Sequence, residues 1–134
     1  MKLEDQLREE DVKPVKILVA YLIKNGFDVS LEGSAKRGNK TYRDVDLLCV
    51  GSRKDVDRFA RLINKPFERT LGSFGSVEEM LALKHVISIE GVLYEVRRPL
   101  IKESGYVDQK IDYRGQFYNG NTEIDLSLKK KQSR

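Results

Sequence analysis

The sequence predicts an α+β domain in which helices cover a mixed β-sheet. Apolar residues recur at three- and four-residue intervals over residues 3–25, as on one face of a helix, and later segments alternate apolar and polar residues as half-buried strands do. The predicted order is helix, strand, strand, helix and then hairpins, which is typical of an α+β fold. At 134 residues the chain has the length of one domain, which we assign to residues 1–128, followed by a basic C-terminal tail at 129–134.

Three helices are predicted, over residues 14–24, 54–64 and 76–83. Pro14 begins the first, because proline suits the first turn of a helix and disfavours helical backbone at the residue before it. Ser52 can cap the second with its hydroxyl, and Pro66 is expected to end it. Ser76 and Glu79 have the spacing of a capping box at the start of the third.

Six strands are predicted, over residues 27–31, 45–50, 85–89, 92–96, 110–118 and 122–128. The segment 45–50 is a short apolar run, as in a buried strand, and Cys49 is expected to be a core residue there. Glu90 and Gly91, and then residues 119–121, have the composition of tight hairpin turns.

The composition limits the classes of function. Hydrophobic residues make up 40% of the chain and charged residues 34%, a balance typical of folded globular proteins. We expect a cytoplasmic protein with no membrane contact, because the first residues lack the apolar stretch of a signal peptide and no run is long enough to span a bilayer. Cys49 and His85 are the only residues of their types, so one chain cannot build a disulfide or a structural zinc site. A metal would have to bind oxygen atoms.

One stretch combines groups that bind phosphate with groups that bind metal. Gly33 and Ser34 follow the first predicted strand, and after nine intervening residues Asp44 and Asp46 lead into the second. Because side chains alternate along a strand, the two aspartates point to the same side, where their mutual repulsion favours a bound cation such as magnesium. Gly33 lets backbone amides approach an anion closely, and Ser34 offers a hydroxyl donor.

Several cations in the same stretch are close enough in sequence to reach phosphate oxygens: Lys36, Arg37, Lys40 and Arg43. The plainer alternatives are that the Asp-x-Asp pair ends a strand for structural reasons and that these cations are only solvated. The combination of strand, Gly-Ser, spacer and Asp-x-Asp is what favours a nucleotide site. The net charge of +4 is compatible with a polyanionic partner but too small to indicate one.

The residues from Gly33 to Gly38, followed by Asp44-Val-Asp46-Leu47, resemble the signature of the DNA polymerase β-type nucleotidyltransferase superfamily, which includes CCA-adding enzymes and minimal nucleotidyltransferases. The resemblance covers mainly residues 15–100. It implies a polymerase β palm-like fold and a two-magnesium transfer of a nucleoside monophosphate from a nucleoside triphosphate to a hydroxyl, with release of pyrophosphate. It further implies roles for individual residues: Gly33, Ser34, Lys36 and Arg37 at the triphosphate, and Asp44 and Asp46 as ligands of both ions.

The family also has a third acid on a later strand. The segment Gly91 to Pro99 is similar to the motif that carries it, and this similarity makes Glu95 the expected third catalytic and metal-binding carboxylate. Asp125 is the alternative, and for either residue a strand acid that simply faces solvent is the plainer interpretation.

Two other interpretations stay open. In one, the fold is a non-catalytic binding module for RNA or a partner protein, which the departures from the family pattern at Glu32 and around Glu95 favour. In the other, the chain is a basic RNA-binding domain whose Asp-x-Asp pair is accidental. The sequence also leaves open whether the acceptor is RNA or a partner protein and whether the chain forms an oligomer.

Overall fold

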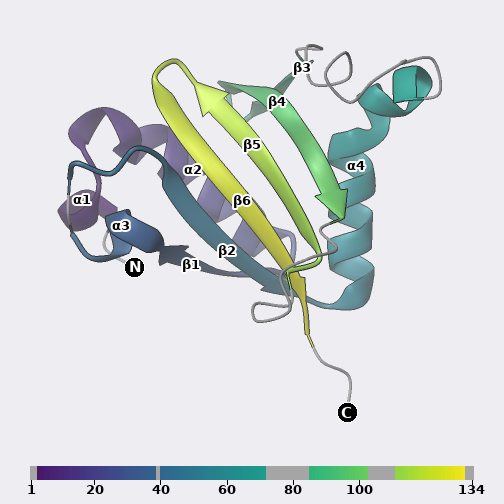
Figure 1. Cartoon of the computed structure of the whole chain (residues 1–134), viewed down its shortest axis with the longest axis horizontal. Helices are drawn as coiled ribbons and strands as arrows, with labels where there is room; N and C mark the ends of the chain where they lie inside the picture. The colour runs from purple at the N-terminus through teal and green to yellow at the C-terminus, as the bar shows by residue number, and fades with distance from the viewer. Residues whose placement is uncertain (1–2, 39, 72–84, 103–110, 132–134) are drawn as a thin grey trace.

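The protein is an α+β domain built on a six-stranded mixed sheet (Figure 1). The structure, a computed structural model, describes residues 3–38, 40–71, 85–102 and 111–131. The helices are α1 (Leu3–Gln6), α2 (Glu9–Lys24), α3 (Gly33–Lys36) and α4 (Arg53–Leu71). The strands are β1 (Asp28–Glu32), β2 (Val45–Gly51), β3 (His85–Ile89), β4 (Val92–Lys102), β5 (Tyr113–Asn119) and β6 (Thr122–Lys130).

The strands lie in the order β1-β2-β6-β5-β4-β3. Strands β2 and β6 run parallel, and every other neighbouring pair is antiparallel. The last strand of the chain is therefore inserted beside β2, in the middle of the sheet. This insertion brings residues near position 45 next to residues near position 124.

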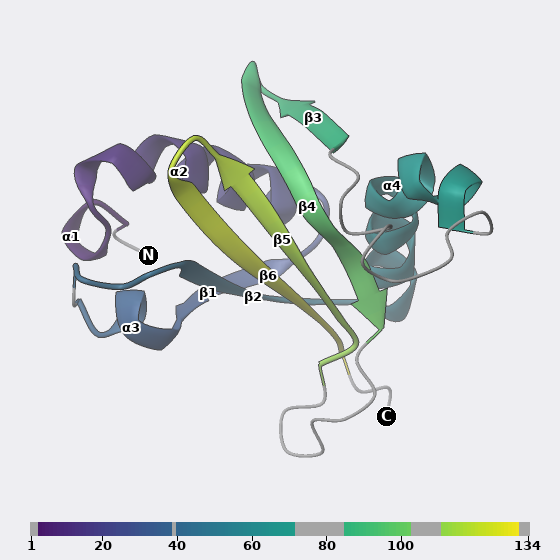
Figure 2. The same cartoon turned by 45° about the horizontal axis from the view of Figure 1, so that its top comes forward.

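Helices α2 and α4 pack against one face of the sheet (Figure 2). The core lies between this face and the two helices, while the other face carries the polar side chains. Side chains of β2, and of β6 as far as Leu128, alternate between buried and partly exposed, as the period of two in a strand requires. Each of the two helices buries one apolar stripe of side chains: Val15, Leu18, Val19 and Leu22 on α2, and Val56, Phe59, Ala60 and Ile63 on α4. None of the described helices combines the length and the apolar character that a bilayer crossing needs.

Two of the predicted helix boundaries are wrong. Helix α2 begins at Glu9 and contains Pro14 in its interior, with the Tyr94 hydroxyl donating a hydrogen bond to the Pro14 carbonyl. Helix α4 passes through Pro66 and ends at Leu71. Packing of the apolar stripes on the sheet outweighs the local preference of proline in both helices. The prediction of a Ser52 cap is confirmed, because Ser52 Oγ accepts a hydrogen bond from the Asp55 N–H at 3.1 Å.

All six predicted strands are present, but two are longer than expected. Strand β4 continues to Lys102 with register irregularities after Val96, and β6 continues to Lys130. Lys129 and Lys130 thus belong to the sheet rather than to a tail, and Lys130 forms an ion pair with Asp57 at 2.9 Å. Cys49 is fully buried in the core, as predicted, while the predicted helix at 76–83 lies outside the described residues.

Candidate functional site

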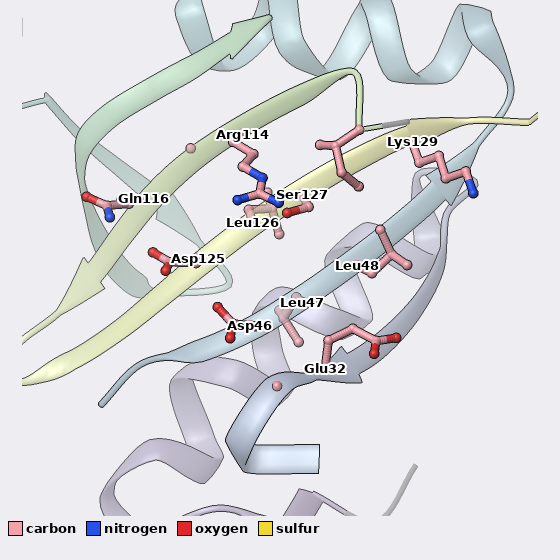
Figure 3. Close-up of a pocket in the computed structure, with 13 residues that line it drawn as sticks. Glu32, Asp46, Leu47, Leu48, Arg114, Gln116, Asp125, Leu126, Ser127 and Lys129 are labelled. Atoms are coloured by element: carbon pink, nitrogen blue, oxygen red, sulfur yellow. The ribbon is translucent and has the colours of Figure 1, made fainter. Parts of the chain in front are cut away.

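The polar face of the sheet carries its functional groups in rows that cross the strands. Strand register aligns Glu32, Asp46, Asp125 and Gln116 in one row and Ser30, Leu48, Ser127 and Arg114 in the next. Figure 3 shows Asp46 and Asp125 side by side on β2 and β6, with both carboxylates raised above the same face. The two acids meet because β2 and β6 are parallel and in register.

Four acids, which we call the acidic cluster, gather where β2 and β6 begin: Asp44, Asp46, Glu123 and Asp125. Carboxylate oxygens of Asp44, Glu123 and Asp125 lie within 4.8 Å of one another. The cluster contains the same sequence pattern twice, as Asp44-Val-Asp46 at the start of β2 and as Glu123-Ile-Asp125 on β6. The two copies lie side by side, because Val45 pairs with Ile124 in the strand register. The apolar residue in each copy points to the core, so the acids point to the open face.

Burial and repulsion from neighbouring acids raise the pKa of two residues of this cluster, Asp125 and Asp46. Burial, followed by a hydrogen bond with Asp44 and the charges of its acidic neighbours, raises the pKa of Asp125 to about 8. Burial and then the charge of Asp44 also raise the pKa of Asp46, while Arg114 and a hydrogen bond with Asp125 act in the opposite direction. Asp125 therefore keeps its proton at neutral pH unless a bound cation displaces it.

The cluster has the donors that a hard divalent cation prefers. Its ligand atoms are all carboxylate oxygens, which suit magnesium, manganese and calcium. Oδ1 of Asp125 is buried and has no hydrogen-bond partner among the described residues. A buried, unsatisfied carboxylate oxygen is costly, and a cation would satisfy it. The residues present therefore fit a bound divalent ion.

Gly33 lies directly beside the cluster. Its backbone has φ +68°, a left-handed conformation that favours glycine, and a Cβ at this position would overlap Asp46 Oδ2. Glu32, the residue before it, pairs with Asp46 in the β1–β2 register. The turn at Gly33 therefore lies directly beside the strand that carries Asp46.

The three other predicted phosphate-binding residues follow on α3 and at its end, and each has a local partner. Arg37 donates a hydrogen bond to Ser34 Oγ at 3.1 Å, and Lys36 forms an ion pair with Glu32 at 3.5 Å. The Lys36 ion pair partly neutralises the acid next to Gly33. Lys40 instead lines a separate depression beside α1 and α2, away from the acidic cluster.

A cavity of about 620 Å³ opens on this face, and Gly33 is among the residues that line it. Asp46 and Asp125 lie together at one end (Figure 3). Arg114 and Lys129 line it further along β5 and β6. The cavity thus offers carboxylates at one end and cations at the other. A ligand that carries phosphates and a coordinated metal would complement both ends.

The structure does not bring Glu95 together with Asp44 and Asp46. Glu95 lies on β4, separated from β6 by β5, and forms an ion pair with Arg97 at 3.1 Å. The acid that joins the pair is Asp125, the alternative from the sequence. The prediction of Glu95 rested on the similarity of its segment to a family motif. The strand next to β2 is instead β6, which comes from the end of the chain.

Glu123 was missed by the sequence reasoning. Its Oε1 accepts a hydrogen bond from the Tyr118 hydroxyl at 2.8 Å, and the Arg97 guanidinium lies 3.9 Å from the centre of the Tyr118 ring. The repeated acid-x-Asp-Leu pattern, at Asp44 and again at Glu123, was the signal that could have found it.

Comparisons of the chain with protein families, with curated proteins and with solved structures find no match.

Proposed function

We propose that this chain is a magnesium-dependent nucleotidyltransferase, which moves a nucleoside monophosphate from a nucleoside triphosphate to a hydroxyl group and releases pyrophosphate. The observation that carries the proposal is the meeting of Asp46 and Asp125 on parallel strands directly beside Gly33. Acidic clusters alone are common on protein surfaces. A cluster that touches a glycine turn and opens into a cavity with cations at its other end is a more specific arrangement.

Asp44, Asp46 and Asp125 would hold the metal, with Asp125 in the role that the sequence first suggested for Glu95. Bound magnesium would lower the pKa of the acceptor hydroxyl and offset charge on the triphosphate. Glu123 would add a further oxygen ligand, because carboxylate oxygens of Glu123, Asp44 and Asp125 lie within 4.8 Å of one another.

The turn after β1 would hold the triphosphate. Backbone at Gly33 has no side chain to keep a phosphate away, and Ser34 still has its hydroxyl proton to donate, since Oγ accepts from Arg37. Lys36 and Arg37 would exchange their present partners for phosphate oxygens, whose charge-assisted hydrogen bonds are stronger.

The proposed reaction is an in-line displacement. An O–P bond forms between the acceptor oxygen and the α-phosphorus, while the bond from that phosphorus to the bridging oxygen breaks and pyrophosphate leaves with the electron pair. Asp125 is the group proposed to accept the proton of the acceptor hydroxyl, because its carboxylate belongs to the acidic cluster and lines the cavity.

The proposal is tested by transfer of label. The protein is incubated with each α-labelled nucleoside triphosphate, magnesium and cell extract, and the RNA and protein fractions are then separated. We expect label in one fraction with the wild type and none with Asp44→Ala or with EDTA. Asp28→Ala is the matched control, because Asp28 is an exposed acid, 84% accessible, at the far end of β1 on the same face.

The two fractions distinguish the acceptor classes, and binding distinguishes the alternative function. Transfer by Asp44→Ala equal to that of the wild type would exclude the assignment. Magnesium-dependent binding of nucleotide without transfer to any fraction would instead support a non-catalytic nucleotidyltransferase-fold module for RNA or a partner protein. Isothermal titration with ATP and magnesium measures that binding directly.

A further inference from the structure

A buried polar network lies beneath the acidic cluster. It consists of Arg8, Asp11, Tyr42 and Thr122, and we call it the Asp11 network. Asp11 and Thr122 are only 2% and 3% exposed. Oδ1 of Asp11 accepts a hydrogen bond from Thr122 Oγ1 at 2.6 Å, and Oδ2 accepts from the Tyr42 hydroxyl and from Arg8 Nε, the latter at 3.2 Å. The backbone N–H of Arg8 donates to the Tyr42 hydroxyl at 2.9 Å.

One carboxylate thereby joins three segments that are distant in sequence. Asp11 lies in the first turn of α2, Tyr42 lies in the segment that enters β2, and Thr122 is the first residue of β6. Tyr42 stands two residues before Asp44, and Thr122 stands directly before Glu123. The network therefore fixes the backbone just ahead of both strands that carry the acids.

The acids need such a fixed backbone. Carboxylates held within 4.8 Å of one another repel, and nothing in their own charges would keep the two strand starts together. Hydrogen bonds from Tyr42 and Thr122 to a single carboxylate are directional and buried, so they set the separation of the strand starts more narrowly than apolar packing does.

Stability alone is a weaker explanation for the network. A buried carboxylate loses its hydration, and well-packed apolar residues of similar size are often as stabilising or more so. Tyr42 and Thr122 lie two residues and one residue from Asp44 and Glu123, where they can act on the position of these acids through the backbone.

We infer that Asp11, acting through Tyr42 and Thr122, positions Asp44 and Glu123 for binding a divalent cation. Asp11 is a positioning residue, since it lies beneath the cluster and touches no ligand. The inference rests on the cation site of the proposed function, and it adds the part of the chain that holds the site in shape.

The test measures cation affinity without any reaction. Terbium is a hard cation that binds carboxylates, and its luminescence can be excited through a nearby tyrosine, here Tyr118, whose hydroxyl contacts Glu123. Titration of the intact protein with terbium gives the affinity, and displacement by magnesium gives the competing affinity. Asp125→Asn identifies the signal that comes from the cluster.

The variants that test the inference either remove one hydroxyl of the Asp11 network or keep it on a smaller side chain. Thr122→Val keeps the shape of the side chain and removes the hydroxyl, Thr122→Ser keeps the hydroxyl, and Tyr42→Phe removes the other donor. We expect Thr122→Val and Tyr42→Phe to weaken terbium binding by about 10-fold, the lower range for residues that orient metal ligands, and Thr122→Ser to restore it.

Tyr113→Phe is the matched control. It also removes a tyrosine hydroxyl that donates to an aspartate, in this case Asp57 at 3.1 Å, but at the other end of β5. We expect it to lower the melting temperature without changing terbium affinity. Each titration is run well below the melting temperature of the variant, so that loss of folding does not contribute.

The outcomes distinguish the positioning role of Asp11 from the existence of the cation site. Wild-type affinity in folded Thr122→Val and Tyr42→Phe overturns the positioning role and leaves the proposed function intact. Should Thr122→Val not fold, Tyr42→Phe alone decides the question. Absence of terbium binding by the wild type, or binding that Asp125→Asn does not reduce, overturns both the cation site and the inference.

Discussion

Gly33 and Asp46 approach so closely that a side chain at position 33 has no room. A Cβ there would overlap Asp46 Oδ2 and lie 3.4 Å from Asp46 Cγ, and the backbone has φ +68°. The turn after β1 and the acid on β2 therefore constrain each other: the position of the Asp46 carboxylate depends on the absence of a side chain one strand away.

Gly33→Ala is expected to displace the Asp46 carboxylate and to weaken divalent-cation binding by at least about 10-fold. Gly38→Ala is the control, since Gly38 has a similar φ of +75°, but no described atom lies within 4 Å of the place that an added methyl group would occupy. Both variants carry the backbone cost of a left-handed alanine, roughly 1 kcal/mol, and both should melt at lower temperature. Equal cation affinities in the two variants would contradict the link between Gly33 and Asp46.

Asp125→Asn is expected to stabilise the protein at pH 8 in the absence of metal. Because the folded protein raises the pKa of Asp125 to about 8 from an ordinary 3.8, the folded chain retains a proton that the unfolded chain releases between those values. This carboxyl group therefore lowers stability as pH rises through that window, and its effect levels off above about pH 8. Asparagine removes the effect.

Melting temperatures from pH 5.5 to 8.5 check this prediction. The wild type should lose stability more steeply than Asp125→Asn, and about 1 kcal/mol corresponds to a shift of roughly 4 °C in a domain of this size. Magnesium should then raise the melting temperature of the wild type at pH 8 and leave that of Asp125→Asn unchanged. Parallel pH profiles for the two proteins would refute the raised pKa.

The sequence predicts the strands better than the arrangement that they form. Alternation of apolar and polar residues is a local property, so β2 and β6 were both found near their observed positions. The pairing of Asp46 with Asp125 is set by the topology of the whole sheet, which no local pattern encodes. Proline signals also failed at Pro14 and Pro66, because packing of the helices on the sheet outweighs local preference.

Only the part of the candidate site that lies within one short stretch of sequence could be predicted. Gly33, Asp44 and Asp46 lie within one short stretch, where spacing alone indicates that they meet. Asp125 and Glu123 come from the end of the chain, and only the parallel insertion of β6 brings them to the cluster.

Cys49 is expected to react with thiol reagents only when the protein unfolds. The residue is fully buried, and burial raises the pKa of its thiol to about 12, so the reactive thiolate is scarce as well as covered. At pH 8 the folded protein should be labelled at least ~1000-fold more slowly than the urea-unfolded chain, as expected for a domain with ordinary stability. Rapid labelling of the folded protein would show that β2 is not buried as described.

Replacement of each candidate third acid by its amide decides between Asp125 and Glu95. Asp125 shares the cluster with Asp44, whereas Glu95 is bound to Arg97 on β4, so Asp125→Asn should reduce label transfer by at least about 100-fold and Glu95→Gln by less than about threefold. Both substitutions replace one carboxyl group by an amide of the same size, so a general effect of losing a carboxyl group would affect them equally. Loss of transfer in Glu95→Gln with retention in Asp125→Asn would restore the assignment that the sequence suggested and remove the acidic cluster from the reaction.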